Sequence, residues 1–248
     1  FVKNMSLILP NAHISYFEDG IGSYMNNLFD YVLKYEPDLK FEMANVDVCR
    51  FRPKDLYLFR PELCKYKNNI SIVPISYVCV NSRQHMERLR QIFGYAKPAI
   101  YNNVKIIFLL TYEEDILYMD EKEGWKGCLD RYKNIIEILK RENYEVVYRL
   151  HPRQTKFQYM DLKVDDTGMQ WELLIPDIIT NNSILISLDS TAALMPKMLY
   201  NMEPYNILIG QYVYEGIDEN KYPKMCENIL TDLYTDKHKI IAIKSVDA

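Results

Sequence analysis

The second half of the chain alternates short apolar runs with helical patterns, and few folds accommodate that order. The apolar runs of strand length are residues 104–110, 144–150, 183–188 and 205–210, and helical patterns cover residues 125–143, 170–180 and 190–201. Continuous apolar strands are typical of a sheet that is covered on both faces. Strands that alternate with helices through short loops therefore predict an α/β domain with a Rossmann-like parallel sheet.

The first hundred residues have a less regular pattern. Residues 22–35 show helical spacing, whereas residues 36–100 are divided by prolines into short pieces, which predicts a connecting region with one helix near residues 82–93. The chain starts with a strand-like pattern and without an initiator methionine, so we expect it to be part of a longer protein. We predict two parts, which are the end of an N-terminal domain with its connecting region (1–100) and a Rossmann-like domain (101–248).

Charge and cysteine content exclude several classes of function. The net charge of −4 gives no overall field that would recruit nucleic acid or anionic lipid, so an anionic ligand needs a local site. The five cysteines include no C-x-x-C pair, which favours reduced thiols. Neither a run of 18 apolar residues nor a signal peptide is present. We expect a cytoplasmic protein, and leave open both peripheral association with the inner membrane face and homo-oligomer formation.

Three polar groups share one place in the pattern, directly after a predicted strand. They are Glu18-Asp19-Gly20, His151-Pro152, and Ser187 with Ser190-Thr191. Ligands of parallel α/β sheets bind beyond the carboxyl ends of the strands, which favours these positions for a site. Each group also has a purely structural interpretation, as a strand-to-helix turn, a loop after a strand, and a helix N-cap respectively. No glycine-rich dinucleotide or P-loop motif accompanies them.

In this order the three groups resemble the motifs of bacterial sialyltransferases with a GT-B fold, the lipooligosaccharide sialyltransferase and capsular polysialyltransferase group. Those enzymes share an acidic D/E-D/E-G motif that closes the N-terminal domain, an H-P motif in the C-terminal domain, and a Ser/Thr-rich motif downstream. The resemblance implies a GT-B-like fold, in which a Rossmann-like domain that binds a CMP-sugar follows a partial N-terminal acceptor-side domain. Family members carry more of that N-terminal domain than this chain does.

The resemblance also implies an activity. The protein would be an inverting, metal-independent glycosyltransferase that transfers sialic acid from CMP-sialic acid to a surface glycan, either lipooligosaccharide or capsular polysaccharide. A carboxylate of the acidic motif would take the proton of the acceptor hydroxyl, with Asp19 as first choice and Glu18 as second. His151 would support the departing phosphate, because histidine exchanges protons near neutral pH.

The same resemblance implies the groups that bind the donor. Ser190 and Thr191 are the expected phosphate ligands, with Ser187 and Pro152 beside them, and Glu172 is placed like the acidic residue that binds the cytidine ribose. The sequence contains no D-x-D triplet of the kind that carries a metal in many diphosphate-sugar enzymes. We therefore expect no metal site and no cofactor other than the donor substrate. Whether Arg149 pairs with the sialic acid carboxylate or is solvated stays open at this point.

Two alternatives remain open. The chain would instead be a GT-B glycosyltransferase that uses a nucleoside-diphosphate sugar, with His151 and the loop near residue 190 serving the same phosphate. Alternatively, it would be a non-catalytic domain that binds glycan or assists assembly. Competition by CMP rather than UDP separates the sialyltransferase from the first alternative, and nucleotide binding without turnover would favour the second.

Overall fold

The chain consists of two compact units, residues 1–78 and residues 79–248, which are described separately. The computed structural model describes residues 15–18, 24, 55–64, 70–75, 82–111, 116, 127–152, 154, 162–188, 190–216 and 225–246. The division after residue 78 lies before the boundary at residue 100 that the sequence suggested, so the helix near residues 82–93 belongs to the second unit.

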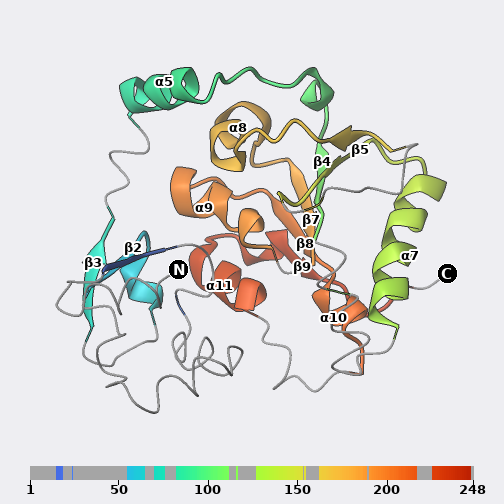
Figure 1. The fold of residues 1–248 in the computed structure, drawn as a ribbon. Coiled ribbons are helices and arrows are strands. Elements are labelled where there is room, and N and C mark those ends of the chain that lie inside the picture. Colours follow the sequence, from blue (N-terminus) through green and yellow to red (C-terminus); the bar gives the residue numbers. More distant parts are fainter. Residues whose placement is uncertain are drawn as a thin grey trace, which may run out of the picture. The chain divides into compact units, whose positions relative to one another are not determined.

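The first unit contains a three-stranded parallel sheet in the order β1-β2-β3 (Figure 1). Its strands are β1 (Ser15–Phe17), β2 (Asp55–Leu58) and β3 (Ser71–Pro74). The strand expected before Glu18 is confirmed, but β2 and β3 lie in the region interpreted as a connection. Their sequences, DLYL and SIVP, include a charged residue or a proline, so neither strand appears as a continuous apolar run.

The second unit is built on a six-stranded parallel sheet in the order β6-β5-β4-β7-β8-β9. The strands are β4 (Ile106–Leu109), β5 (Val146–Arg149), β6 (Val164–Asp165), β7 (Ile184–Ser187), β8 (Tyr205–Leu208) and β9 (Ile240–Ala242). Counted within this unit the order is 3-2-1-4-5-6, which is the strand order of Rossmann-type domains. The four strands predicted from apolar runs are confirmed, whereas the two edge strands, β6 and β9, are too short to predict.

Helices cover both faces of this sheet. They are α5 (Arg83–Ile92), η4 (Ala99–Tyr101), α7 (Cys128–Arg141), α8 (Trp171–Ile178), η5 (Thr191–Ala193), α9 (Met195–Tyr200), α10 (Gly210–Val213), α11 (Met225–Leu233) and η6 (Lys237–Lys239). Figure 1 shows α7 and α10 on one side of the sheet and α8, α9 and α11 on the other. The helix expected over residues 190–201 is divided into η5 and α9. Pro196, at the start of α9, cannot continue a helical hydrogen-bond ladder from the preceding turn.

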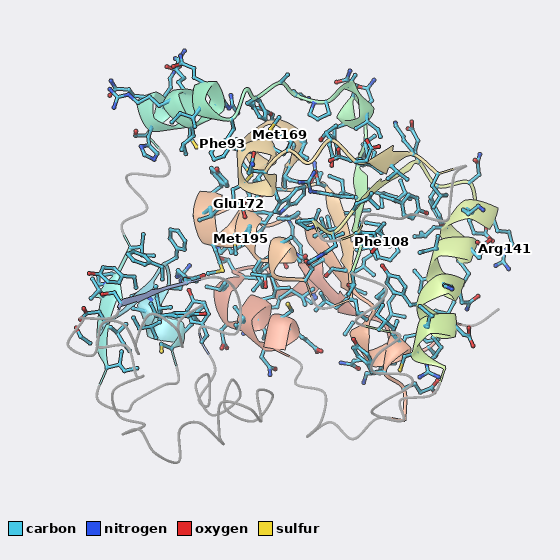
Figure 2. All side chains as sticks on the ribbon, viewed as in Figure 1. Phe93, Phe108, Arg141, Met169, Glu172 and Met195 are labelled. Carbon is cyan, nitrogen blue, oxygen red and sulfur yellow. The ribbon has the colours of Figure 1, made fainter. Side chains whose placement is uncertain are left out.

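The core follows from the alternation of side chains along the strands. Phe108, Tyr148 and Ile186 pack against Tyr132 of α7 in one buried cluster, and Figure 2 shows Phe108 between the sheet and α7. The intervening strand residues, such as Leu185, point to the opposite face, which α8 and α9 cover. None of the helices in the described part of the chain has the length and hydropathy of a membrane span.

Candidate functional site

The strand order brings two of the three predicted polar groups to the same edge of one sheet. β5 and β7 are the two neighbours of β4, so His151, which follows β5, and Ser187, the last residue of β7, lie on either side of the β4 exit. Neighbouring strands are separated by about 4.8 Å, so the ends of β5 and β7 lie about 10 Å apart. The strand order reverses between β4 and β7, and that point is where Rossmann-type sheets bind their ligands.

The polar groups after β7 are arranged around a tight turn. Ser187 is fully buried, and its hydroxyl has no hydrogen-bond partner within the described residues. Ser190 is the N-cap of η5, and its Oγ accepts a hydrogen bond from the Ala192 N–H at 3.3 Å. A hydroxyl that accepts in this way still has its own proton to donate. Thr191 follows as the first residue of η5 and is half-buried, whereas Asp189 lies outside the described residues.

The His-Pro pair forms the turn that leaves β5. The His151 carbonyl accepts a hydrogen bond from the Gln154 N–H at 2.8 Å, which turns the chain away from the sheet. His151 is half-buried and Pro152 is exposed. His151 is therefore partly exposed at the carboxyl end of β5. Arg153 lies outside the described residues.

Arg149, at the end of β5, belongs to a buried ion pair. Its guanidinium donates to the Asp165 carboxylate and to the Met169 carbonyl. The Tyr101 hydroxyl also donates to Asp165, at 2.5 Å, and Thr167 donates to it through its N–H and its hydroxyl at 3.1 Å and 2.7 Å. Arg149 is therefore engaged within the protein, which settles the question that the sequence left open between a donor ligand and a solvated side chain.

The ionised state of this pair follows from its hydrogen bonds. Burial acts to raise the pKa of Asp165, but hydrogen bonds from Tyr101 and Thr167 and the charge of Arg149 outweigh it, so its pKa lies below the ordinary value. Burial raises the pKa of Tyr101, and its hydrogen bond to Asp165 raises it further. Tyr101 therefore stays a donor and Asp165 an acceptor, which fixes the loop between β6 and α8.

Glu172 lies in the first turn of α8, with its side chain exposed. Its backbone carbonyl accepts a hydrogen bond from the Tyr200 hydroxyl of α9 at 2.7 Å, and Figure 2 shows Glu172 beside α9. The residue before it, Trp171, donates through its indole Nε1 to the Ala192 carbonyl at 2.8 Å. Two hydrogen bonds between α8 and the η5–α9 segment therefore link the backbone of Glu172 and the turn at residues 190–192.

The acidic group belongs to the first unit and is described there. Glu18 follows β1, and its N–H donates to the Tyr57 carbonyl of β2 at 2.9 Å. The Glu18 carboxylate accepts hydrogen bonds from the Phe59 N–H at 2.8 Å and from the Tyr24 hydroxyl at 2.5 Å. Glu18 thus holds the chain that leaves β2. Asp19 lies outside the described residues, as does the acidic stretch at residues 113–115.

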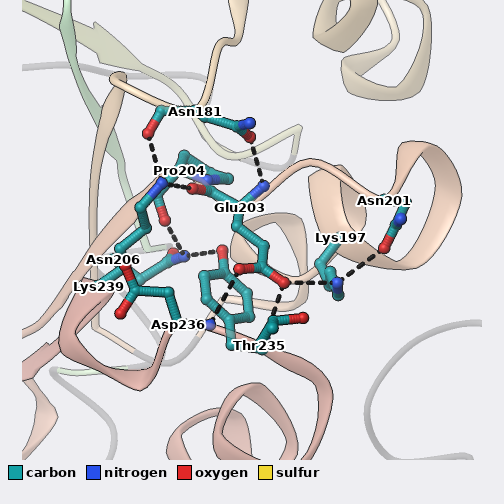
Figure 3. Close-up of polar contacts among 10 residues, drawn as sticks. Asn181, Lys197, Asn201, Glu203, Pro204, Asn206, Thr235, Asp236 and Lys239 are labelled. Carbon is teal, nitrogen blue, oxygen red and sulfur yellow. Dashed lines mark hydrogen bonds and ion pairs between the residues drawn. The ribbon is translucent and has the colours of Figure 1, made fainter.

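A second polar cluster lies at the opposite edge of the six-stranded sheet, where strands β7, β8 and β9 begin (Figure 3). Its members are Asn181, Lys197, Asn201, Glu203, Thr235, Asp236 and Lys239. Lys197 Nζ, which is buried, donates to Glu203 at 2.6 Å and to Asn201 at 2.7 Å. The Glu203 carboxylate also accepts from the N–H groups of Thr235 and Asp236. Asn181, before β7, accepts from the Glu203 N–H at 2.8 Å and from Lys239 Nζ at 2.9 Å, so the bonds join the segments that enter three strands and the cluster has a structural role.

Among the described residues, no group of three or more His, Cys, Asp or Glu side chains is arranged to hold a metal ion. Comparison of the chain with protein-family models and with curated proteins gave no match.

Sequence analysis missed Asp165, Trp171 and Tyr200, which support the candidate site without belonging to a motif. The sequence contains one signal that points to the roles of Trp171 and Tyr200. Pro176 and Pro196 lie within predicted helices, and each removes the N–H that would bond the carbonyl four residues before it. Those carbonyls belong to Glu172 and Ala192, which are the acceptors of Tyr200 and Trp171.

Proposed function

We propose that this chain is the donor-binding part of a GT-B-like sialyltransferase that transfers sialic acid from CMP-sialic acid to a bacterial surface glycan. The observation that carries the proposal is the 3-2-1-4-5-6 strand order with His151 and the Ser187 to Thr191 segment on either side of the β4 exit. Such an edge is where Rossmann-type domains bind nucleotides. The order of the three polar groups along the chain selects this enzyme class from the many that share the sheet.

In the proposed site, hydroxyl groups hold the phosphate of the nucleotide. Ser190 donates its hydroxyl proton to a phosphate oxygen while its Oγ keeps the Ala192 N–H. Thr191 adds a second hydroxyl, and the buried Ser187 hydroxyl gains the partner that it lacks among the described residues. A monophosphate carries less charge than a diphosphate, so neutral donors of this kind are sufficient to hold it.

His151 lies across β4 from these hydroxyls and is the proposed acid. As the bond between the anomeric carbon and the CMP phosphate breaks, the phosphate oxygen gains negative charge, and a histidine N–H hydrogen-bonds to it or protonates it. Arg149 lies two residues before His151, and its ion pair with Asp165 holds the end of β5. The resemblance gives the role of acceptor base to a carboxylate of the Glu18-Asp19-Gly20 group.

Of the two carboxylates in that group, we propose Asp19 as the base and Glu18 as a positioning residue. The Glu18 carboxylate binds the Phe59 N–H and the Tyr24 hydroxyl, so its removal would disturb the chain that leaves β2. Asp19→Asn should abolish transfer, whereas Glu18→Gln should lower the unfolding temperature and leave measurable transfer. Full activity of Asp19→Asn would overturn this assignment and move the base to Glu18.

The proposal is tested first by calorimetric titration of the chain with CMP, CDP and UDP. We expect CMP to bind more tightly than the two diphosphates, and the Ser190→Ala, Thr191→Ala double variant to lose that binding while keeping its circular dichroism spectrum. Preference for UDP or CDP would support a diphosphate-sugar enzyme in place of a sialyltransferase. No binding of any of the three nucleotides to the folded chain would overturn the donor site.

A further inference from the structure

Two backbone carbonyls on one face of the sheet lie four residues before a proline, so neither can receive an N–H from that position. Pro176 lies inside α8 and Pro196 is at the start of α9, and proline has no N–H to donate to the carbonyl four residues earlier. The carbonyls concerned belong to Glu172 and Ala192. A carbonyl that loses its helical partner inside a packed structure destabilises the fold unless another donor replaces that partner.

Each carbonyl receives that hydrogen bond from an aromatic side chain of the other segment. Trp171 of α8 donates from Nε1 to the Ala192 carbonyl at 2.8 Å, and Tyr200 of α9 donates its hydroxyl to the Glu172 carbonyl at 2.7 Å. The two bonds run in opposite directions between α8 and the η5–α9 segment. We refer to Trp171, Tyr200 and the carbonyls of Glu172 and Ala192 as the α8–α9 clasp.

The surroundings keep both donors in place. Trp171 is buried, and the guanidinium of Arg149 lies over its ring, with 5.4 Å between Cζ and the ring centroid. Burial raises the pKa of Tyr200 to about 12, with a further rise from the charge of Glu172 and an opposing effect of Arg90. The Tyr200 hydroxyl therefore stays protonated at neutral pH and remains a donor.

We propose that the α8–α9 clasp sets the spacing between Glu172 and the turn at residues 190–192, so that Trp171 and Tyr200 are positioning residues for a bound nucleotide. This inference rests on the proposed function, in which Glu172 binds the ribose and the turn binds the phosphate. A single nucleotide would have to contact groups from two separate segments. The α8–α9 clasp joins the first turn of α8 directly to Ala192, the last residue of the turn at residues 190–192. Preorganised groups of this kind bind more tightly because less freedom is lost on binding.

The test uses the Pro196 position as an internal control. Trp171→Phe keeps an aromatic ring but removes the N–H, and it should weaken CMP binding by roughly fivefold to tenfold, the effect of one hydrogen bond. In a Pro196→Ala background, the new N–H of residue 196 supplies the donor to the Ala192 carbonyl. There, Trp171→Phe should still weaken CMP binding by about the same factor, because an N–H from the same segment gives the carbonyl a partner without restoring the link to α8.

A variant remote from the site controls for general destabilisation. Tyr234→Phe removes a hydroxyl that accepts from the buried Asn206 side chain at 2.6 Å, near the beginning of β8. It should lower the unfolding temperature about as much as Trp171→Phe does, yet leave the CMP dissociation constant unchanged. An equal loss of CMP affinity in both variants would overturn the positioning role.

Fluorescence gives a second measurement that leaves Trp171 intact. The chain has two tryptophans, so Trp171 is the only tryptophan in a Trp125→Phe background and is excited selectively at wavelengths that tyrosine does not absorb. CMP bound at the turn should shift the emission of Trp171, because its indole N–H is bonded to the Ala192 carbonyl. Ser190→Ala, Thr191→Ala in the same background should abolish that shift. This measurement stands even if Trp171→Phe fails to fold.

The outcomes separate the inference from the proposed function. If the parent chain binds CMP, an unchanged dissociation constant in Trp171→Phe, or a Trp171 emission that does not change at saturating CMP, overturns the inference alone. If the folded parent binds none of CMP, CDP and UDP, the proposed function is overturned and the inference with it. Weaker binding in Trp171→Phe that persists in the Pro196→Ala background supports both, and recovery of binding in that background overturns the inference alone.

Discussion

At the scale of single residues, the carboxylate of Glu203 has a pKa far below its ordinary value. Burial acts to raise its pKa, but the hydrogen bond from Lys197 and those from the N–H groups of Thr235 and Asp236 lower it from 4.5 to about 2. Because the folded-state pKa lies below the unfolded one, Glu203 stabilises the fold fully above about pH 4.5. That contribution is lost as the pH falls toward 2.

We therefore predict that Glu203→Gln lowers the free energy of unfolding by about 3 kcal/mol at pH 7, since it leaves the buried Lys197 ammonium without its charge partner. Thermal unfolding followed from pH 7 to pH 3 should show a smaller loss of stability on acidification in the variant than in the parent. Identical pH profiles would contradict the role given to Glu203.

A double-mutant cycle completes that test. Lys197→Met should also destabilise the chain, and the double variant Lys197→Met, Glu203→Gln should be more stable than the sum of the two single losses predicts. Strict additivity would mean that the 2.6 Å contact between the two side chains contributes nothing of its own.

The Ser187 hydroxyl should affect the stability of the isolated chain and the binding of CMP differently. Its hydroxyl is buried and lacks a partner among the described residues, so Ser187→Ala should leave the free energy of unfolding unchanged or raise it by up to about 1 kcal/mol. The same variant should bind CMP roughly tenfold more weakly, because the proposed site uses that hydroxyl. Urea unfolding and calorimetry on one preparation measure both quantities, and a large loss of stability would mark Ser187 as purely structural.

At the level of secondary-structure elements, the end of α7 offers a stabilising change. Asn143 follows the helix with φ 54°, and it donates its N–H to the Lys140 carbonyl at 2.9 Å while Tyr144 donates to the Leu139 carbonyl at 3.2 Å. This is a Schellman ending, in which glycine is favoured at the left-handed position. Asn143→Gly should raise the free energy of unfolding by about 0.5 kcal/mol.

The control for this element is Asn102→Gly. Asn102 is also exposed and follows a short helix, but its φ is −67°, so glycine relieves no strain there and only adds freedom to the unfolded chain. Chemical unfolding should therefore show a gain for Asn143→Gly and a small loss for Asn102→Gly. Equal effects at both positions would contradict the explanation from backbone conformation.

At the level of the whole molecule, the second unit has a complete sheet and core within residues 79–248. We predict that this fragment unfolds cooperatively when produced alone. A fragment of residues 101–248 should be less stable, because it loses the Arg90–Asp177 ion pair at 2.9 Å and the Tyr95–Asp177 hydrogen bond at 2.5 Å. Thermal unfolding followed by circular dichroism compares the two. Equal melting temperatures would show that α5 adds no stability.

The elements with strong local patterns were predictable from sequence. β4, β5, β7 and β8 are continuous apolar runs because both faces of the sheet are covered, and α7 has a helical period long enough to recognise. The positions of His151, Ser187 and Ser190 after their strands followed from the same patterns. Four strands were missed. β6 and β9 are only two and three residues long, whereas β2 (DLYL) and β3 (SIVP) contain a charged residue or a proline and so are not continuous apolar runs.

What local sequence could not decide is which distant groups become neighbours. The placement of β4 between β5 and β7 depends on pairing between strands separated by a whole helix or more, so the candidate site exists only in the folded sheet. Arg149 was ambiguous in the sequence because its partners, Asp165 and Met169, lie on another loop. Pro176 and Pro196 indicate in the sequence that the carbonyls of Glu172 and Ala192 receive no N–H from four residues later. Only the tertiary structure decides that Tyr200 and Trp171 are their donors, because a hydrogen bond forms only where folding brings donor and acceptor within reach.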